Sequence, residues 1–244
     1  MLMNLTDHTA HRPYPLPKGP WLMTQTWENL LFAHWPVNAA VLRQLVPATL
    51  ELDTYDDQAW IGIVPFQMSN IHARGIPPIP GTAAFPELNV RTYVKHGGKA
   101  GVYFFSLDAA NRLAVATARR FFHLPYFNAE MSVQVDEQSR VNYASRRTHR
   151  DAPPAVFQAD YRPVSAVWHS QPGTLDHWLT ERYCLYTTYQ NTVYCGEIHH
   201  LPWPLQHAEA EIRANTMFEV PDGAPLLQFA QKLVTLIWPL HKLT

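Results

Sequence analysis

The sequence is poor in the residues that mark metal, redox and nucleotide-binding proteins. Its two cysteines, Cys184 and Cys195, flank a predicted turn at 189–191 and form no CxxC pair. This usage is typical of a reducing compartment, so two free thiols are favoured over a disulfide. There are 13 histidines but no HExxH and no Cys/His spacing that would gather three or four ligands, so no metal site is predicted. Glycine is scarce, with no phosphate or dinucleotide loop and no GxSxG, and we predict no cofactor.

Clustered positive charge and long apolar runs are also missing. The net charge is -1 and no basic run occurs, which argues against nucleic acid and anionic membrane as partners. No apolar run approaches the ~20 residues of a membrane span. The first residues lack the charged start and apolar core of a signal peptide. We therefore expect a cytoplasmic protein; its partners are a small-molecule ligand and, as an open alternative, a second copy in a homo-oligomer.

What the chain has in abundance is proline, at 21 residues, and apolar residues, at 47%. Frequent prolines favour many short strands joined by rigid turns over long helices. We predict a Pro-rich lead-in at 1–20 and a single domain at 21–244. The fold class is mainly antiparallel β (α+β), with three or four helices. Strands are predicted at 24–35, 50–52, 59–68, 88–94, 101–107, 131–135, 141–147, 155–161, 183–188, 192–199 and 210–214, and helices at 39–45, 108–122, 175–182 and 226–238.

Three of these predictions are specific enough to test. The strands at 50–52 and 59–68 should form a hairpin around the turn at 55–58. Asp108 should cap the helix that follows it. The loop at 75–81 holds three prolines, precedes the strand at 88–94, and is expected to line a pocket.

One predicted strand has an unusual polar face. Side chains alternate along a strand, so Glu87, Asn89, Arg91 and Tyr93 share one face, with successive members ~6.6–7 Å apart. Inside a cavity, Arg91 could clamp a ligand carboxylate and Glu87 could transfer a proton. The alternative is that this face simply meets water, and the pattern alone favours that alternative.

Other candidate residues come from neighbouring segments. Arg119 lies near the end of the predicted helix, where it could pair with Glu87 or interact with the helix carbonyls. Tyr126 follows Pro125, which fixes the chain direction; its hydroxyl could serve a site or be hydrogen-bonded core. His199 shares a strand face with Glu197, while His200 lies on the other face.

Several longer segments resemble the bacterial YqjF-like family. They are WENLLFAHWP at 27–36, AWIGIVPF at 59–66, FPELNVRTYV at 85–94, GVYFFSLDA at 101–109, LPY at 124–126, LTERYCLY at 179–186 and GEIHHLPWPL at 196–205. That family is distantly similar to the acetoacetate decarboxylase superfamily. The resemblance implies a β-barrel or cone, with peripheral helices, around a small-molecule cavity. It also implies that Glu87, Arg91, Arg119 and Tyr126 converge on the cavity.

The resemblance fails at the residues that carry the decarboxylase reaction. Where those enzymes have the Schiff-base lysine and its neighbouring lysine, this sequence has Tyr126 and Phe127. A phenol cannot form the imine that serves as electron sink. We therefore expect a cavity that binds a small carbonyl or carboxylate compound without Schiff-base chemistry. Glu87 and Tyr126 are the candidate catalytic residues, and Arg91, Arg119, Asn89, Tyr93 and His199 the candidate ligand-binding residues. Two alternatives remain: a non-catalytic interaction module, and a decarboxylase or other lyase that uses a displaced lysine.

Overall fold

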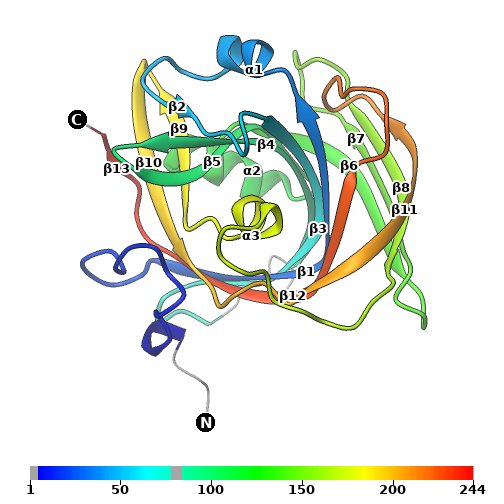
Figure 1. Ribbon diagram of the computed structural model, residues 1–244, viewed down its shortest axis with the longest axis horizontal. Coiled ribbons are helices and arrows are strands. Elements are labelled where there is room, and N and C mark those ends of the chain that lie inside the picture. The colour runs from blue at the N-terminus through cyan, green and yellow to red at the C-terminus, as the bar shows by residue number, and fades with distance from the viewer. Residues whose placement is uncertain (1–4, 78–83, 244) are drawn as a thin grey trace.

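The computed structural model describes residues 5–77 and 84–243, and its strands dominate the architecture (Figure 1). The helices among these residues are α1 (Ala39–Leu45), α2 (Arg112–Phe121) and α3 (Leu175–Thr180), with a short 3-10 turn at Leu5–Asp7. The strands are β1 (Met23–Val37), β2 (Glu51–Leu52), β3 (Ala59–Ala73), β4 (Phe85–His96), β5 (Lys99–Ala109), β6 (Tyr126–Val135), β7 (Val141–Arg147), β8 (Val156–Pro163), β9 (Cys184–Tyr189), β10 (Thr192–His199), β11 (Leu205–Asn215), β12 (Leu226–Ile237) and β13 (His241–Lys242).

The strand pairings close into two rings that share a wall. Within the described residues, β5–β6–β7–β8–β11–β12–β1–β3–β4 returns to β5 and forms a closed nine-stranded barrel. On the other side, β9 and β10 bridge β5 to β12 and close a second ring over the same β12–β1–β3–β4–β5 wall. Figure 1 shows β6, β7, β8 and β11 to one side of this wall and β9 and β10 to the other, with α3 between the strands of the second ring.

Alternation along the shared wall gives each ring its own interior. Leu88 and Val90 of β4 pack with Tyr143 and Phe157 in the core of the nine-stranded barrel. Their neighbours Glu87 and Asn89 point the opposite way, into the second ring. The polar strand face is therefore an internal surface, and the alternative in which it meets bulk water is wrong.

The predicted helix at 226–238 is wrong, because this segment is strand β12. The stripe of Leu226, Ala230, Leu233 and Ile237 has helical spacing, yet β12 pairs with β1 along its length and with β10 and β11 on its other edge. A strand in the wall between two interiors is apolar on both faces, so it loses the period-two signal.

Other sequence predictions need correction in their pairing and boundaries. β2 pairs with β4, not with β3, so 50–52 and 59–68 do not form a hairpin. Asn111 rather than Asp108 caps α2: its Oδ1 accepts from the amides of Leu113 and Ala114, while Asp108 still belongs to β5.

The sheet is mostly antiparallel, but β5 runs parallel to β6 and β9. The predicted loop at 75–81 lies outside the described residues from 78 onward.

Within the described part of the chain, no helix has both the length and the apolar character needed to cross a bilayer.

Candidate functional site

The second ring encloses a cavity of about 330 Å³. Its walls come from β1, β3, β4 and β5 on one side and from α2 and the segments around β9 and β10 on the other. Most of the lining is apolar and aromatic. The polar groups of β4, namely Glu87, Asn89 and Arg91, interrupt this lining along one strand. A largely apolar pocket with a few converging polar groups is the usual form of a small-molecule site.

Glu87 and Tyr126 meet inside this cavity. The Tyr126 hydroxyl donates a hydrogen bond of 2.7 Å to Glu87 Oε2, and both side chains are buried. Burial raises the pKa of Glu87 to about 8; the hydrogen bond from Tyr126 opposes this rise, and the charge of Asp108 adds to it. Burial beside Glu87 also raises the pKa of Tyr126 well above its ordinary value. At neutral pH the pair is therefore a carboxylic acid and a phenol, both able to donate hydrogen bonds.

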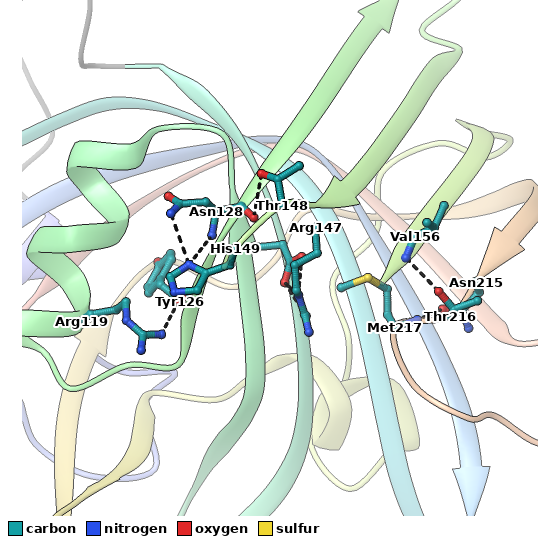
Figure 2. A network of polar contacts seen from close by, with 11 residues as sticks. Arg119, Tyr126, Asn128, Arg147, Thr148, His149, Val156, Asn215, Thr216 and Met217 are labelled. Atoms are coloured by element: carbon teal, nitrogen blue, oxygen red, sulfur yellow. Dashed lines mark hydrogen bonds and ion pairs between the residues drawn. The ribbon is translucent and has the colours of Figure 1, made fainter. Parts of the chain in front are cut away.

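A network behind the cavity wall fixes the position of Tyr126 (Figure 2). Arg119 of α2 donates from Nη1 to the Tyr126 carbonyl at 2.7 Å. Two residues further along β6, the backbone amide of Asn128 donates to His149 Nδ1 at 3.1 Å, which makes Nδ1 the acceptor. Arg119 is thus a support for Tyr126; it does not line the cavity, and the prediction that it converges there with Glu87 is wrong. It also lies over the Phe127 ring, at 5.8 Å from the ring centre.

Arg91 is the cation of the cavity that lacks a counter-charge. It forms no ion pair with any described residue, and its Nε has no hydrogen-bond partner among them. Its guanidinium lies 5.2 Å from the centre of the Phe32 ring and 5.9 Å from that of Tyr93. Asn89 Oδ1, two residues away on the same face, is likewise buried without a partner in the described part of the chain. Such groups are costly to leave unpaired, and both are placed to meet a polar ligand.

Tyr93 lies beyond Arg91 at the closed end of the ring. It does not line the cavity; its hydroxyl is 2.6 Å from Nε2 of the buried His34. Burial, with the charge of Arg91 nearby, lowers the pKa of His34 well below its ordinary value, so this imidazole is neutral. Trp178 of α3 packs on the Tyr93 ring at 4.7 Å and closes this end.

A second guanidinium, that of Arg182, reaches the same end; it is ion-paired, but its Nη2 has no hydrogen-bond partner among the described residues. Arg182 lines the cavity and donates from Nη1 to Asp53 Oδ2 at 2.6 Å. Lys95 binds the other oxygen of Asp53, also at 2.6 Å. Sequence reasoning missed Arg182, because the segment after α3 gave no signal of which way its side chains point.

His199 was predicted to bind ligand, but it faces away from the cavity. Its Nε2 is 2.9 Å from the Leu5 carbonyl and its Nδ1 is 3.2 Å from Arg12, so it anchors the N-terminal segment against β10. Burial lowers the pKa of His199 to about 4. The adjacent His200 takes the opposite orientation and lines the cavity.

The described cavity lining contains no lysine. Three of the lysines are used in ion pairs: Lys95 with Asp53, Lys99 with Glu197, and Lys232 with Glu28. Both cysteines are buried and free. Within residues 5–77 and 84–243, no group of three or more His, Cys, Asp or Glu side chains is arranged to hold a metal ion.

Comparison with solved structures places the fold. An acetoacetate decarboxylase-like enzyme from Sphingomonas wittichii RW1 is similar with a TM-score of 0.64 and 12% identity, over 93% of this chain and 94% of that one. The enduracididine biosynthesis enzyme MppR, in complex with pyruvate, is similar with a TM-score of 0.63 and 10% identity, over 95% and 93% of the two chains. At these identities the likeness shows the fold alone, which is that of the acetoacetate decarboxylase-like proteins.

Comparison of sequences finds a more similar protein. The chain is 51% identical over 243 residues to the "Uncharacterized protein YqjF" of Bacillus subtilis strain 168, covering 98% of this chain and 99% of that protein. The model of the DUF2071 family, described as an uncharacterized conserved protein, matches residues 24–235. The chain therefore belongs to the DUF2071 family, with YqjF as a full-length relative and an acetoacetate decarboxylase-like fold.

Proposed function

We propose that this protein binds a small carboxylate that also carries a carbonyl group, in the cavity of the second ring. The observation that carries the proposal is Arg91, a cation inside an apolar cavity with no ion pair to any described residue. A guanidinium in such a place recognises a carboxylate through two parallel hydrogen bonds. MppR, which has the same fold, is known in complex with pyruvate, an oxo acid, and this supports the ligand class.

Glu87 and Tyr126 are assigned to the carbonyl. Because the pKa of Glu87 is raised to about 8, its carboxyl group carries a proton at neutral pH and can donate to a carbonyl oxygen. Tyr126 already donates to Glu87 and keeps the carboxyl group oriented. A carboxylate at Arg91 and a carbonyl near Glu87 would meet complementary groups on one strand face.

The test is a thermal-shift screen of oxo acids against matched aldehydes and amides. A ligand that binds only the folded state raises the melting temperature. We expect the acids to stabilise the wild type and to lose this effect in Arg91→Ala, whereas Arg120→Ala, an exposed arginine on α2, should behave as the wild type. If the acids give no shift, or if Arg91→Ala responds as the wild type does, the proposal fails.

A second candidate function, acid–base catalysis on the bound compound, is favoured by the pKa of Glu87. A group that titrates near neutral pH is well suited to proton transfer. In its carboxylate form Glu87 would take a proton from the carbon next to the carbonyl, which leaves an enolate, and would then return a proton to that carbon; Tyr126, which donates to Glu87 Oε2, would hold the carboxylate in position. This predicts exchange of those hydrogens for deuterium in D₂O, followed by NMR, with loss of the exchange in Glu87→Gln. If these hydrogens exchange no faster with the protein than in buffer alone, the protein binds the compound but does not catalyse proton transfer.

Schiff-base chemistry does not fit the cavity. Its described lining offers no lysine, and Tyr126 occupies the position at which the resemblance would have placed one. Treatment with acetoacetate and borohydride should leave the protein mass unchanged. If mass mapping finds an adduct on any lysine, the alternative of a decarboxylase that uses a displaced lysine is supported instead.

A further inference from the structure

The cavity extends well beyond the polar groups that would hold a carboxylate. Phe85 and Arg91 both line it, from the two ends of one face of β4. Six residues of extended strand span ~20 Å. An oxo acid the size of pyruvate would fill only the end near Arg91. Such a ligand would leave the part of the cavity toward Phe85 empty.

The two ends of the cavity differ in polarity. At the inner end, closed by α3, Arg91 Nε and Asn89 Oδ1 are buried without partners among the described residues. At the opposite end one buried polar atom of the lining, Trp203 Nε1, has no partner among the described residues, while other neutral polar groups are engaged. Gln25 accepts from Trp27 Nε1 at 3.0 Å, and Asn111 accepts from the amides at the start of α2. Of the buried lining atoms without a partner in the described part of the chain, Arg91 Nε, Asn89 Oδ1 and Arg182 Nη2 lie at the inner end, so both charged groups that a carboxylate could meet are there.

The outer end is built from apolar side chains of β1, β3, β4 and α2. Met68, Phe85 and Leu113 all line this part, together with Trp27, which stacks on Trp203 at 5.7 Å. Leu113 is 67% exposed although it lines the cavity, so it stands at the mouth. An apolar side chain exposed at the rim of an apolar channel gains stability when a hydrocarbon covers it.

We propose that the ligand is a monocarboxylic acid with an extended apolar tail. Its head lies at Arg91 and Asn89, and its tail runs along the β4 face past Glu87 and Phe85 to Leu113 at the mouth. Glu87 lies between the two ends, where its proton meets an oxo or hydroxyl group on the chain. This assignment rests on the function proposed above and adds the substrate class: long-tailed acids rather than pyruvate-sized ones.

The experiment is a chain-length series measured by calorimetry: acetate, butanoate, hexanoate, octanoate and decanoate, with octylamine and octanol as head-group controls. Each methylene that enters the channel should tighten Kd by about threefold to fourfold. The amine and the alcohol should bind at least tenfold more weakly than octanoate. Arg91→Ala should remove the preference for the acid over the alcohol.

Two matched variants locate the tail. Leu113→Glu puts a charge at the mouth and should abolish the gain from hexanoate to decanoate while leaving butanoate unchanged. Val164→Glu changes a side chain that is also exposed, at 51%, but does not line the cavity, and should match the wild type. Both sites are on the surface, so folding is preserved.

The outcomes separate this inference from the proposed function. If short acids bind through Arg91 but Kd does not improve with chain length, the tail is wrong and the carboxylate site stands. If Leu113→Glu leaves the whole series unchanged, the tail does not leave by this mouth and the assignment is overturned. If no acid of the series binds, the tail assignment fails; the proposed function fails as well only if the oxo acids give no thermal shift.

Discussion

The Tyr126 hydroxyl group lies 2.7 Å from Glu87 Oε2, and this hydrogen bond limits how far burial raises the pKa of Glu87. The two residues come from separate strands, β4 and β6, that the nine-stranded barrel brings to one point. The contact joins the cavity wall to the α2–β6 segment. Because both groups are buried, the protonation state of Glu87 is coupled to the stability of the fold.

The first prediction concerns the pH dependence of that stability. Folding raises the pKa of Glu87 from 4.5 to about 8. Between these values the folded state keeps a proton that the unfolded state releases. The free energy of unfolding should therefore fall as pH rises through this window, by up to ~1.4 kcal/mol per pH unit from this group.

The measurement is urea unfolding of the wild type and Glu87→Gln from about pH 5 to about pH 8. The amide does not titrate, so the variant should gain stability relative to the wild type with each step upward. Parallel stability curves would show that Glu87 is not protonated in the folded protein.

The second prediction separates the two tyrosines that contact Glu87. Tyr126→Phe removes the hydrogen bond to the carboxyl group, so the pKa of Glu87 should rise further and the pH window should widen upward. Tyr143 donates to the backbone carbonyl of Glu87 at 2.7 Å and is also buried. Tyr143→Phe should cost about 1 kcal/mol of stability but leave the pH window unchanged. Equal effects of the two variants on that window would contradict the assignment.

The polar face of β4 could be predicted from the sequence because it needs only strand periodicity. Phe85 to His96 forms a continuous strand, so Glu87, Asn89 and Arg91 share a face whatever the rest of the fold does. The direction of that face could not be predicted from the same pattern. It depends on the second ring, which β5 and β12 close through pairings with β9 and β10, far away in the chain.

The remaining site errors have the same origin. His199 and His200 are adjacent, and a shift of one residue decides which of them faces the cavity. Leu226–Ile237 appeared helical because a strand apolar on both faces carries no alternation to oppose a chance helical stripe. Arg119 was placed in the cavity by resemblance, whereas its position on α2 takes it to the Tyr126 carbonyl.

The third prediction concerns the buried ion pair between Asp108 of β5 and Arg147 of β7. Arg147 binds Asp108 with both Nε and Nη2, and the two side chains are 8% and 0% exposed. Asp108→Asn leaves the guanidinium without its counter-charge and should cost about 3–5 kcal/mol. Replacing both residues, as Asp108→Leu with Arg147→Met, should recover most of that loss. A double variant as unstable as the single one would show that packing, not charge, is what Asp108 contributes. Urea unfolding measures both.

The fourth prediction compares two glycines at which a side chain has no room. A Cβ at Gly62 would lie 3.0 Å from Cδ2 of His34, a fully buried ring whose Nε2 is held 2.6 Å from the Tyr93 hydroxyl. Gly62→Ala should cost about 1–2 kcal/mol, and this cost should vanish in a His34→Ala background, where the obstructing ring is gone.

At Gly101 the obstacle is the backbone itself. A Cβ there would lie 2.6 Å from the Cys184 carbonyl oxygen and 2.7 Å from its Sγ, at the junction where β5 runs beside β9. Gly101→Ala should cost about 3 kcal/mol or more, because the strands must separate to admit the methyl group. Truncation to Cys184→Ala removes the sulfur contact but not the carbonyl, so it should rescue only part of the loss. If Cys184→Ala rescues the whole loss, the contact with the carbonyl oxygen costs nothing, and the prediction that β5 and β9 resist separation is wrong.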